Sequence, residues 1–440
     1  MTPAQNPWPA PVSPGTLDAT VHVPGSKSLT NRHLVVAALG AEPVDVVAPL
    51  DSRDTRLMAD ALTALGATVQ RGEADGSPVW RVGPLPVGQG DAPVSVDCGL
   101  AGTVMRFVPV LAALQRRPVT FDGDPEARKR PMGPVIEALR ALGAEVSGGE
   151  DGRLPFTVTG NDAVLGGEVS VDASGSSQFV SALLLAGARL PQGIHVRHTG
   201  ERLPSPQHVA MTLRVLEAAG LSVSTDEDGR GWAVEAGVPS PGTVVVEPDL
   251  SNAGPFLGAA LVCGGTVRVP HWPAESTQIG ALWVPLLREL GADVVLHDGV
   301  LEVTGTGHLF PVDAADTGEL APTLAALCAL ADGESTLTGI AHLRGHETDR
   351  LAALSTELNR VGVPTVELED GLRISPAGAR HAAAWESYAD HRMATAGALV
   401  GLATPGVTVE DVATTAKTLP DFVGMWEAML ATATPAERTA

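Results

Sequence analysis

Apolar and small residues recur at helical spacing in two kinds of segment along the chain. In the first kind, a helix rich in small apolar residues begins with polar or charged residues. Such helix starts lie near Ser28, Ala101, Ser176, Ser251, Glu319 and His391. Their spacing of about 70 residues is too long for a solenoid repeat and fits a compact unit of two helices and several strands. We therefore predict that the chain consists of six similar units.

The second kind of helix ends at a glycine and runs into a strand. Its copies are MADALTALGATV, VIEALRALGAEV, TLRVLEAAGLSV, VPLLRELGADVV and LSTELNRVGVPTV, at residues 58–69, 135–146, 212–223, 284–295 and 354–366. Each glycine stands where a left-handed helix C-cap is expected, and the residues that follow alternate or run apolar as strands do. This second helix is evident in every unit but the last.

Six units divide most naturally into two domains of three, because 440 residues exceed what one hydrophobic core usually supports. A composition shift at residues 242–248, after an acidic and glycine-rich loop, marks the crossing point. The strand-like residues 19–23 precede the first unit, so we expect them to pair with the C-terminal half. One domain is then discontinuous. The expected boundaries are residues 1–24 with 246–440 for that domain, and 25–245 for the inserted one.

Composition limits the kinds of partner. The formal net charge of -22 argues against binding to nucleic acid or to a membrane surface, because both need clustered Lys and Arg. Cys98, Cys263 and Cys328 lack metal-ligand spacing and are interpreted as small buried residues of a cytoplasmic, reducing compartment. Residues 1–15 indicate a loose proline-rich tail and not a signal peptide, and interrupted apolar runs such as residues 393–409 predict no membrane span.

The first helix start, PGSKSLTNR at residues 24–32, has the donors that an anion needs. Its glycine frees the turn, its serines can cap orphan N–H groups, and Lys27 and Arg32 add charge to the positive end of the helix dipole. The spacing of a Walker loop is missing. The stretch is equally compatible with an ordinary capped helix start with two solvated cations.

Other helix starts add further polar groups. Gly102 would permit close backbone approach to a ligand. Ser176, Ser177 and Gln178 offer two hydroxyls and an amide, either for an anion or as a capping motif. Glu319 begins the fifth unit's first helix, where the dipole stabilises a carboxylate that could act as a base.

Charged motifs later in the chain complete the candidate set. Residues 128–130 are three successive cations, and we interpret the first two as solvated surface residues. The backbone of Arg130 is restricted by the proline that follows it, which makes Arg130 the better ligand candidate. Residues 346–350 indicate a helix start with Glu347 and Arg350 on one face, a pattern that is also common for surface ion pairs. The cations available for an anion are Lys27, Arg130, Arg350, Arg392 and Lys417, with Glu319 and Glu347 as carboxylates for proton transfer.

Seven motifs in this order resemble the 5-enolpyruvylshikimate-3-phosphate synthase family: PGSKSLTNR, AGTVMRF, RKRPMG, SGSSQFV, HETDRL, DHRMA and AKTLPDF. The resemblance runs from about residue 21 to 422, and we expect the last motif, AKTLPDF at residues 416–422, to close the ordered part of the chain. It implies an α/β (α+β) fold of two similar lobes, each of three βαβαββ repeats in an inverse α/β barrel or prism, with the active site in the interdomain cleft. The lobes of the family close on substrate.

The resemblance also implies an activity, that of a 3-phosphoshikimate 1-carboxyvinyltransferase. Such an enzyme transfers the enolpyruvyl group of phosphoenolpyruvate to the 5-hydroxyl of shikimate 3-phosphate and releases phosphate, in the route to chorismate and the aromatic amino acids. The two small molecules are its substrates, and neither a metal nor an organic cofactor is required. We expect a cytoplasmic monomer.

Roles carry over to matching positions. Glu319, where the family commonly has Asp, is implied to take the hydroxyl proton, and Glu347, helped by Lys27, to protonate the methylene carbon. The implied phosphoenolpyruvate ligands are Lys27, Gly102, Arg130, Gln178, Arg350, Arg392 and Lys417. The implied shikimate 3-phosphate ligands are Lys27, Ser28, Arg32, Ser176, Ser177, Gln178, Ser205, Glu319 and His346.

Some positions depart from the commoner family pattern. They are Leu100 for Asn, Phe107 for Pro, His208 for Tyr, His342 for Asn and His346 for Lys. A histidine at position 346 would bind an anion if protonated, so that affinity would depend on pH. A related transferase that acts on UDP-N-acetylglucosamine is the nearest alternative, but it typically has a Cys in the loop matching residues 128–131. The second alternative is a non-catalytic relative that only binds an anion. The two carboxylates Glu319 and Glu347 argue against this alternative.

Overall fold

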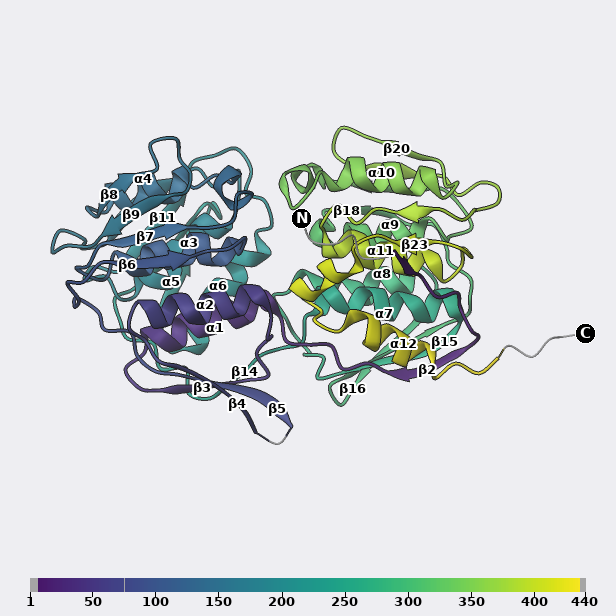
Figure 1. The fold of residues 1–440 in the computed structure, drawn as a ribbon, viewed down its shortest axis with the longest axis horizontal. Coiled ribbons are helices and arrows are strands. Elements are labelled where there is room, and N and C mark those ends of the chain that lie inside the picture. The colour runs from purple at the N-terminus through teal and green to yellow at the C-terminus, as the bar shows by residue number, and fades with distance from the viewer. Residues whose placement is uncertain (1–6, 75, 436–440) are drawn as a thin grey trace, which may run out of the picture. The chain divides into compact units, whose positions relative to one another are not determined.

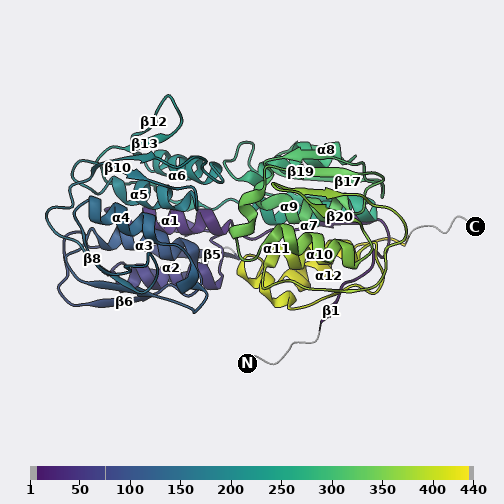
Figure 2. The ribbon, with the colours of Figure 1, turned by 90° about the horizontal axis from the view of Figure 1, so that it is seen from above.

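The computed structural model describes residues 7–74 and 76–435. By internal contacts, Gly25–Val246 forms one compact unit, the inserted lobe, and Met1–Pro24 with Glu247–Ala440 forms another, the discontinuous lobe. Figures 1 and 2 show that each lobe combines helices with several small sheets. The sheets of the described residues are separate and open, so the predicted repeats are present but do not close into a barrel.

The inserted lobe has three four-stranded sheets of one topology. Their orders are β14 (Val244–Val245), β3 (Val44–Val47), β5 (Ser77–Val82), β4 (Val69–Ala74); β6 (Val94–Asp97), β7 (Val119–Asp122), β9 (Phe156–Thr159), β8 (Glu145–Gly148); and β10 (Gly167–Val171), β11 (Ile194–His198), β13 (Gly231–Val234), β12 (Val223–Thr225). In each, the first pair is parallel and the other pairs are antiparallel. The order strand, helix, strand, helix, strand, strand confirms the predicted repeat, with β14 from the far end of the lobe completing the first sheet.

The discontinuous lobe repeats this pattern in two of its three sheets, and its third sheet has three strands. Its sheets are β2 (Leu17–Thr20), β15 (Gly265–Pro270), β17 (Val300–Gly305), β16 (Asp293–His297); β18 (Asp313–Ala315), β19 (Ser335–Thr338), β21 (Leu372–Ile374), β20 (Thr365–Glu367); and β22 (Ala384–Trp385), β23 (Thr408–Val409), β1 (Trp8–Pro9). The parallel pairing of β2 with β15 confirms that the N-terminal strand joins the C-terminal half, although the strand begins two residues before the predicted position.

All six predicted small-residue helices are present, as inner helices of the two lobes. They are α1 (Lys27–Leu39), α3 (Gly102–Ala112) and α5 (Gln178–Gly187), and α7 (Leu250–Cys263), α9 (Ala321–Cys328) and α11 (His391–Gly401). Every residue of α9 and α11 is buried, because small side chains let helices and sheets approach closely on all sides. The two helices lie side by side in both views (Figures 1 and 2).

The outer helices have one buried face each. They are α2 (Arg53–Ala64), α4 (Gly133–Ala141) and α6 (Gln207–Ala218), and α8 (Trp283–Glu289), α10 (Arg350–Arg360) and α12 (Phe422–Leu430). The predicted C-terminal glycines are confirmed: φ is +102° at Gly66, +95° at Gly143, +81° at Gly220, +101° at Gly291 and +89° at Gly362. Backbone with positive φ costs little only at glycine, which explains the recurrence of this residue after the outer helices.

Three expectations about chain ends and starts were wrong. Trp8–Pro9 is a strand, and the Trp8 and Phe422 ring centroids lie 6.2 Å apart in an edge-on arrangement, so the predicted loose tail is wrong for these residues. Residues 1–6 of the predicted tail lie outside the described residues. Ordered structure continues past Phe422 as α12, because Phe422 and Trp426 are core residues. The fifth unit's second helix begins at Arg350, after Asp349 as N-cap, and residues 346–349 precede it.

Candidate active site

The start of α3 in the inserted lobe is a point where three polar side chains converge on one glycine. A Cβ at Gly102 would lie 3.1 Å from Arg106 Nη1, 3.1 Å from Arg130 Nη2 and 3.2 Å from Gln178 Oε1. The absent side chain therefore leaves room beside two guanidinium groups and an amide at the N-terminus of a helix. Such a place attracts anions, because backbone N–H groups and the helix dipole add to the side-chain charges.

Arg106 is a functional candidate to which the sequence analysis gave no role. Arg106 is 2% exposed. Its Nη1 donates to the carbonyl of Gly102 and its Nη2 to the carbonyl of Pro131, while its Nε has no hydrogen-bond partner in the described part of the chain. Burial, followed by the charge of Arg130, lowers the pKa of Arg106. A carboxylate or phosphate at this place would offset both effects. The signal in the sequence was its position one helical turn after Gly102.

The start of α1 carries Lys27 and Arg32 in different environments. Lys27 Nζ lies 3.7 Å from Asp54 Oδ2, and its side chain is 19% exposed. Arg32 is buried and spans elements, because its guanidinium donates to Thr212 Oγ1 at 2.8 Å, to Ser181 Oγ at 3.3 Å and to the carbonyls of Ser28 and His208. Burial lowers its pKa to about 9. The Leu29 N–H donates to Ser26 Oγ, so the predicted capping is confirmed, but the buried Arg32 is not the solvated cation of an ordinary capped helix start.

The start of α5 gathers the predicted hydroxyls. Ser177 occupies the N-cap position without a side-chain cap bond, whereas Ser176 Oγ accepts the Gln178 backbone N–H at 3.2 Å. Ser177 Oγ lies 3.5 Å from the ring nitrogen Nδ1 of His208. The backbone N–H of His208 donates to the carbonyl of Ser205. Ser205 adopts φ of +48°, an uncommon backbone conformation for a serine. Buried Gln178 Oε1 accepts no hydrogen bond among the described residues.

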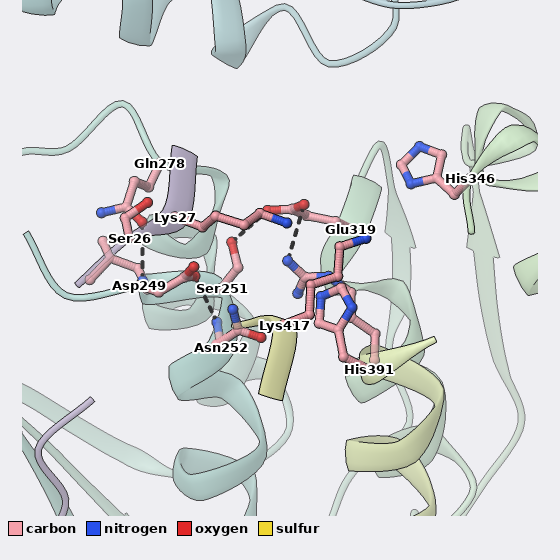
Figure 3. Close-up of polar contacts among 12 residues, drawn as sticks. Ser26, Lys27, Asp249, Ser251, Asn252, Gln278, Glu319, His346, His391 and Lys417 are labelled. Atoms are coloured by element: carbon pink, nitrogen blue, oxygen red, sulfur yellow. Dashed lines mark hydrogen bonds and ion pairs between the residues drawn. The ribbon is translucent and has the colours of Figure 1, made fainter. Parts of the chain in front are cut away.

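In the discontinuous lobe, Glu319 lies in the short 3-10 helix Gly318–Leu320 that leads into α9. Its Oε1 accepts a hydrogen bond from Ser251 Oγ at 2.9 Å, and its Oε2 lies 3.0 Å from Arg392 Nη2 (Figure 3). Ser251 belongs to the start of α7, which Asp249 caps by accepting from the Asn252 N–H. The structure thus brings three helix starts of this lobe to one carboxylate.

Glu347 bridges two of the predicted cations. Its Oε1 pairs with Lys417 Nζ, and its Oε2 lies 3.2 Å from Arg350 Nη2. The side chain of Arg350 is only 2% exposed. Its pair with Glu347 is therefore not an ordinary i,i+3 pair at the surface. Burial alone would lower the pKa of Arg350, but the carboxylates of Asp390 and Glu347 raise it. The guanidinium therefore stays charged.

Asp390 is the second functional candidate without a role predicted from the sequence, although it belongs to the motif DHRMA. It caps α11 through the Arg392 N–H at 2.8 Å, and its carboxylate accepts two bonds from Arg350, at 2.7 and 3.2 Å. His346 Nδ1 lies 3.2 Å from Arg350 Nη1. Desolvation and the Arg350 charge lower the pKa of His346.

The two lobes differ in how their cations are balanced. In the discontinuous lobe, Arg350, Arg392 and Lys417 each pair with a carboxylate. In the inserted lobe, Arg106 and Arg130 have no carboxylate within 4.0 Å among the described residues. The inserted lobe thus offers uncompensated positive charge, and the discontinuous lobe offers carboxylates whose ionised form is held by cations.

Other predicted residues take the expected structural roles. Arg128 pairs with Asp122 and Lys129 with Glu126 on exposed surface, which confirms their interpretation as solvated cations. Cys98 and Cys328 are the expected buried thiols, and burial raises their pKa to about 12, whereas Cys263 is only half-buried, contrary to the expectation. No group of three metal-ligating side chains and no helix long and apolar enough to cross a membrane occurs within residues 7–74 and 76–435.

Comparisons with known proteins cover nearly the whole chain. A family model described as EPSP synthase (3-phosphoshikimate 1-carboxyvinyltransferase) matches residues 12–426. A 3-phosphoshikimate 1-carboxyvinyltransferase of Kocuria rhizophila is 56% identical over 426 residues, which are 95% of each chain. One of Bifidobacterium longum is 52% identical over 438 residues, which are 97% of this chain and 98% of the relative.

Solved structures agree in fold. The EPSP synthase of Acinetobacter baumannii superposes with a TM-score of 0.78 at 25% identity and covers 95% of this chain and 97% of its own. The enolpyruvyl transferase NikO of Streptomyces tendae, at 18% identity, has a TM-score of 0.71 over 94% of this chain and 95% of its own, and it supports the fold alone.

Proposed function

Because the chain belongs to the EPSP synthase family, a family of enolpyruvyl transferases, we propose that it transfers the 1-carboxyvinyl group of phosphoenolpyruvate to the 5-hydroxyl of shikimate 3-phosphate. The products are 5-enolpyruvylshikimate 3-phosphate and phosphate, on the route to chorismate and the aromatic amino acids. The observation that carries this proposal is the division of charge: arginines around Gly102 that have no carboxylate partner among the described residues, and two cation-held carboxylates, Glu319 and Glu347.

The cations are proposed to bind the donor. Phosphoenolpyruvate carries a carboxylate and a phosphate, and bidentate guanidinium contacts suit both groups. The proposed ligands are Lys27, Gly102, Arg130, Gln178, Arg350, Arg392 and Lys417, to which the buried position of Arg106 adds a further candidate. The proposed ligands of shikimate 3-phosphate are Lys27, Ser28, Arg32, Ser176, Ser177, Gln178, Ser205, Glu319 and His346.

Arg32 has a second, structural task in this proposal. Its four hydrogen bonds to Ser28, Ser181, His208 and Thr212 join α1, α5 and α6. A buried cation held in this way contributes a fixed positive field to the acceptor phosphate even where its N–H groups are already used by the protein.

The carboxylates are proposed to move protons in an addition followed by an elimination. In the addition, the 5-hydroxyl oxygen bonds to C2 of phosphoenolpyruvate, its proton passes to Glu319, and Glu347 gives a proton to C3, which becomes a methyl group. In the elimination, the bond between C2 and the phosphate oxygen breaks, and the leaving phosphate takes up the proton that Glu319 received. A methyl proton returns to Glu347, and the carbon–carbon double bond re-forms. The sum is transfer of the enolpyruvyl group and release of phosphate.

Glu347 needs a proton before it can act as the acid. Its two pairs, with Lys417 and Arg350, favour the ionised carboxylate in the absence of substrate. An anion that binds these cations would leave the carboxylate beside negative charge, which favours its neutral, proton-donating form. Donor binding and protonation of Glu347 are therefore coupled in this proposal.

A phosphate-release assay tests the proposal. Purified protein is given phosphoenolpyruvate with shikimate 3-phosphate, or with UDP-N-acetylglucosamine as the alternative acceptor. We expect phosphate only with the first acceptor. Release with the nucleotide sugar alone would identify the other transferase class, and no release with either would favour a binding protein.

We also propose that the enzyme acts as a monomer in the cytoplasm, where its three thiols, Cys98, Cys263 and Cys328, stay reduced. Light scattering during size-exclusion chromatography tests the first statement. A mass near 45.1 kDa supports it, and a mass twice as large contradicts it.

A further inference from the structure

Tyr388, the only tyrosine of the chain, lies in a strained loop of the discontinuous lobe. The loop joins β22 to α11, and both Tyr388 and Ala389 have φ of +54°. Left-handed backbone costs about 1–2 kcal/mol at a residue other than glycine. Two such residues in succession persist only where the surrounding structure over-determines the conformation.

The group that holds this loop is the carboxylate of Glu357 on α10. Its side chain is 0% exposed. Oε1 accepts the Tyr388 hydroxyl at 2.7 Å, and Oε2 accepts the backbone N–H of Glu386 at 3.2 Å and a guanidinium N–H of Arg360 at 2.9 Å. Three donors from two elements thus meet on one buried carboxylate.

The same helix and the same loop are joined at a second place. Arg350 and Glu357 both lie on the buried face of α10, about two helical turns apart. Arg350 binds Asp390, which ends the loop, and Asp390 in turn caps α11 through the Arg392 N–H. The loop conformation therefore determines where the Asp390 carboxylate stands, and that carboxylate orients Arg350 and the first turn of α11.

We propose that Tyr388 and Glu357 are positioning residues for the donor-binding arginines: the hydroxyl-to-carboxylate bond fixes the strained loop, and the loop fixes Arg350 and Arg392 through Asp390. The inference rests on the proposed function, since it assigns these arginines to phosphoenolpyruvate. Neither positioning residue takes part in proton transfer. Their effect is on the geometry of binding.

Tyr388→Phe tests the inference, because it removes the hydroxyl and keeps the ring. We expect KM for phosphoenolpyruvate to rise about 10-fold or more. A small displacement of residues that position a substrate can lower the efficiency of an enzyme by up to about 100-fold. KM for shikimate 3-phosphate should rise less, because the arginines are not among its proposed ligands, although they contact two of them, Glu319 and His346.

Ser335→Ala is the matched control. Ser335 is buried in β19 of the same lobe, and its Oγ accepts the Val312 N–H at 3.0 Å. This variant also loses one buried hydrogen bond, so we expect a similar decrease in thermal stability and unchanged KM values. A Tyr388→Phe enzyme that loses stability like the control but keeps the wild-type KM for phosphoenolpyruvate would overturn the positioning role.

Glu357→Gln provides a second test that does not depend on folding of the first variant. The amide cannot accept from all three donors that the carboxylate serves, so KM for phosphoenolpyruvate should rise by about 3-fold or more, and again by more than KM for the acceptor. An unchanged KM in folded Glu357→Gln enzyme also overturns the inference. Absence of phosphate release by the wild type would instead contradict the proposed function.

Discussion

The guanidinium of Arg350 lies against the carboxylate of Asp390 in the interior of the discontinuous lobe. Nε and Oδ2 are 2.7 Å apart, and the two side chains are 2% and 0% exposed. Two opposite charges out of water are stable only together, because each alone would carry its full desolvation cost. The pair also caps α11 and orients a proposed substrate ligand, so folding and binding depend on the same contact.

Asp390→Asn should destabilise the protein strongly. The substitution keeps the size and the capping oxygen but leaves the buried Arg350 with less compensation, and we expect a loss of about 3 kcal/mol of unfolding free energy. Urea unfolding followed by circular dichroism measures this. Asp162→Asn is the control, since Asp162 pairs with Arg116 at 81% and 57% exposure and should cost less than about 1 kcal/mol. Equal losses would contradict the importance of burial.

Stability should decrease below pH 6.5 because of His33 on α1. Burial, followed by the charge of Arg32, lowers the pKa of His33 to about 4. The unfolded chain, with a histidine pKa of about 6.5, takes up this proton first. The contribution of the neutral histidine is therefore complete above pH 6.5 and is lost as the pH falls to about 4, with at most about 2 kcal/mol gone at pH 5.

His33→Gln is the variant that isolates this effect. Its unfolding free energy should depend less on pH between 7 and 5 than that of the wild type, while other acid-sensitive groups act equally on both. Urea unfolding at the two pH values gives the comparison. Parallel decreases in the two proteins would show that His33 does not contribute.

The repeats could be predicted from the sequence because the features that define them depend on residues close together along the chain. Helical spacing, polar helix starts and five C-terminal glycines each involve neighbouring residues, and all five glycines have positive φ. The function of Asp390 could not be predicted in this way, since its partner Arg350 lies 40 residues away. Similarly, Arg32 looked like a solvated or ligand-binding cation, but its Thr212 partner is 180 residues distant. Such contacts are determined by tertiary packing.

Gly102→Ala should weaken donor binding without loss of stability. The backbone there accepts an alanine, but the new methyl group would stand 3.1 Å from both Arg106 Nη1 and Arg130 Nη2. The guanidinium groups must then shift, and the space for an anion becomes smaller. We expect KM for phosphoenolpyruvate to rise about 10-fold. In Gly72→Ala the nearest atom is 3.6 Å away, so this control should keep its KM.

Glu347→Gln should lower turnover much more than it lowers affinity. The amide keeps the shape of the side chain but cannot donate a proton to carbon, and loss of a general acid typically costs about 100-fold or more in kcat. The dissociation constant of phosphoenolpyruvate, from a fluorescence titration, should change by less than about 10-fold. Glu126→Gln, on an exposed carboxylate paired with Lys129, is the control. Wild-type turnover in Glu347→Gln would exclude the proposed role.

Lys27→Met should affect binding and chemistry together, because Lys27 is assigned both to phosphoenolpyruvate and to the proton transfer by Glu347. The methionine fills the space of the stem and removes the charge, which lies 3.7 Å from Asp54. We expect a rise in KM for phosphoenolpyruvate and a decrease in kcat, each about 10-fold or more. Lys129→Met removes a charge that is 68% exposed and should change neither value. If calorimetry showed normal affinity of Lys27→Met for phosphoenolpyruvate, Lys27 would not be a donor ligand. Arg106 and Arg130 would then be the cations proposed to bind the donor around Gly102.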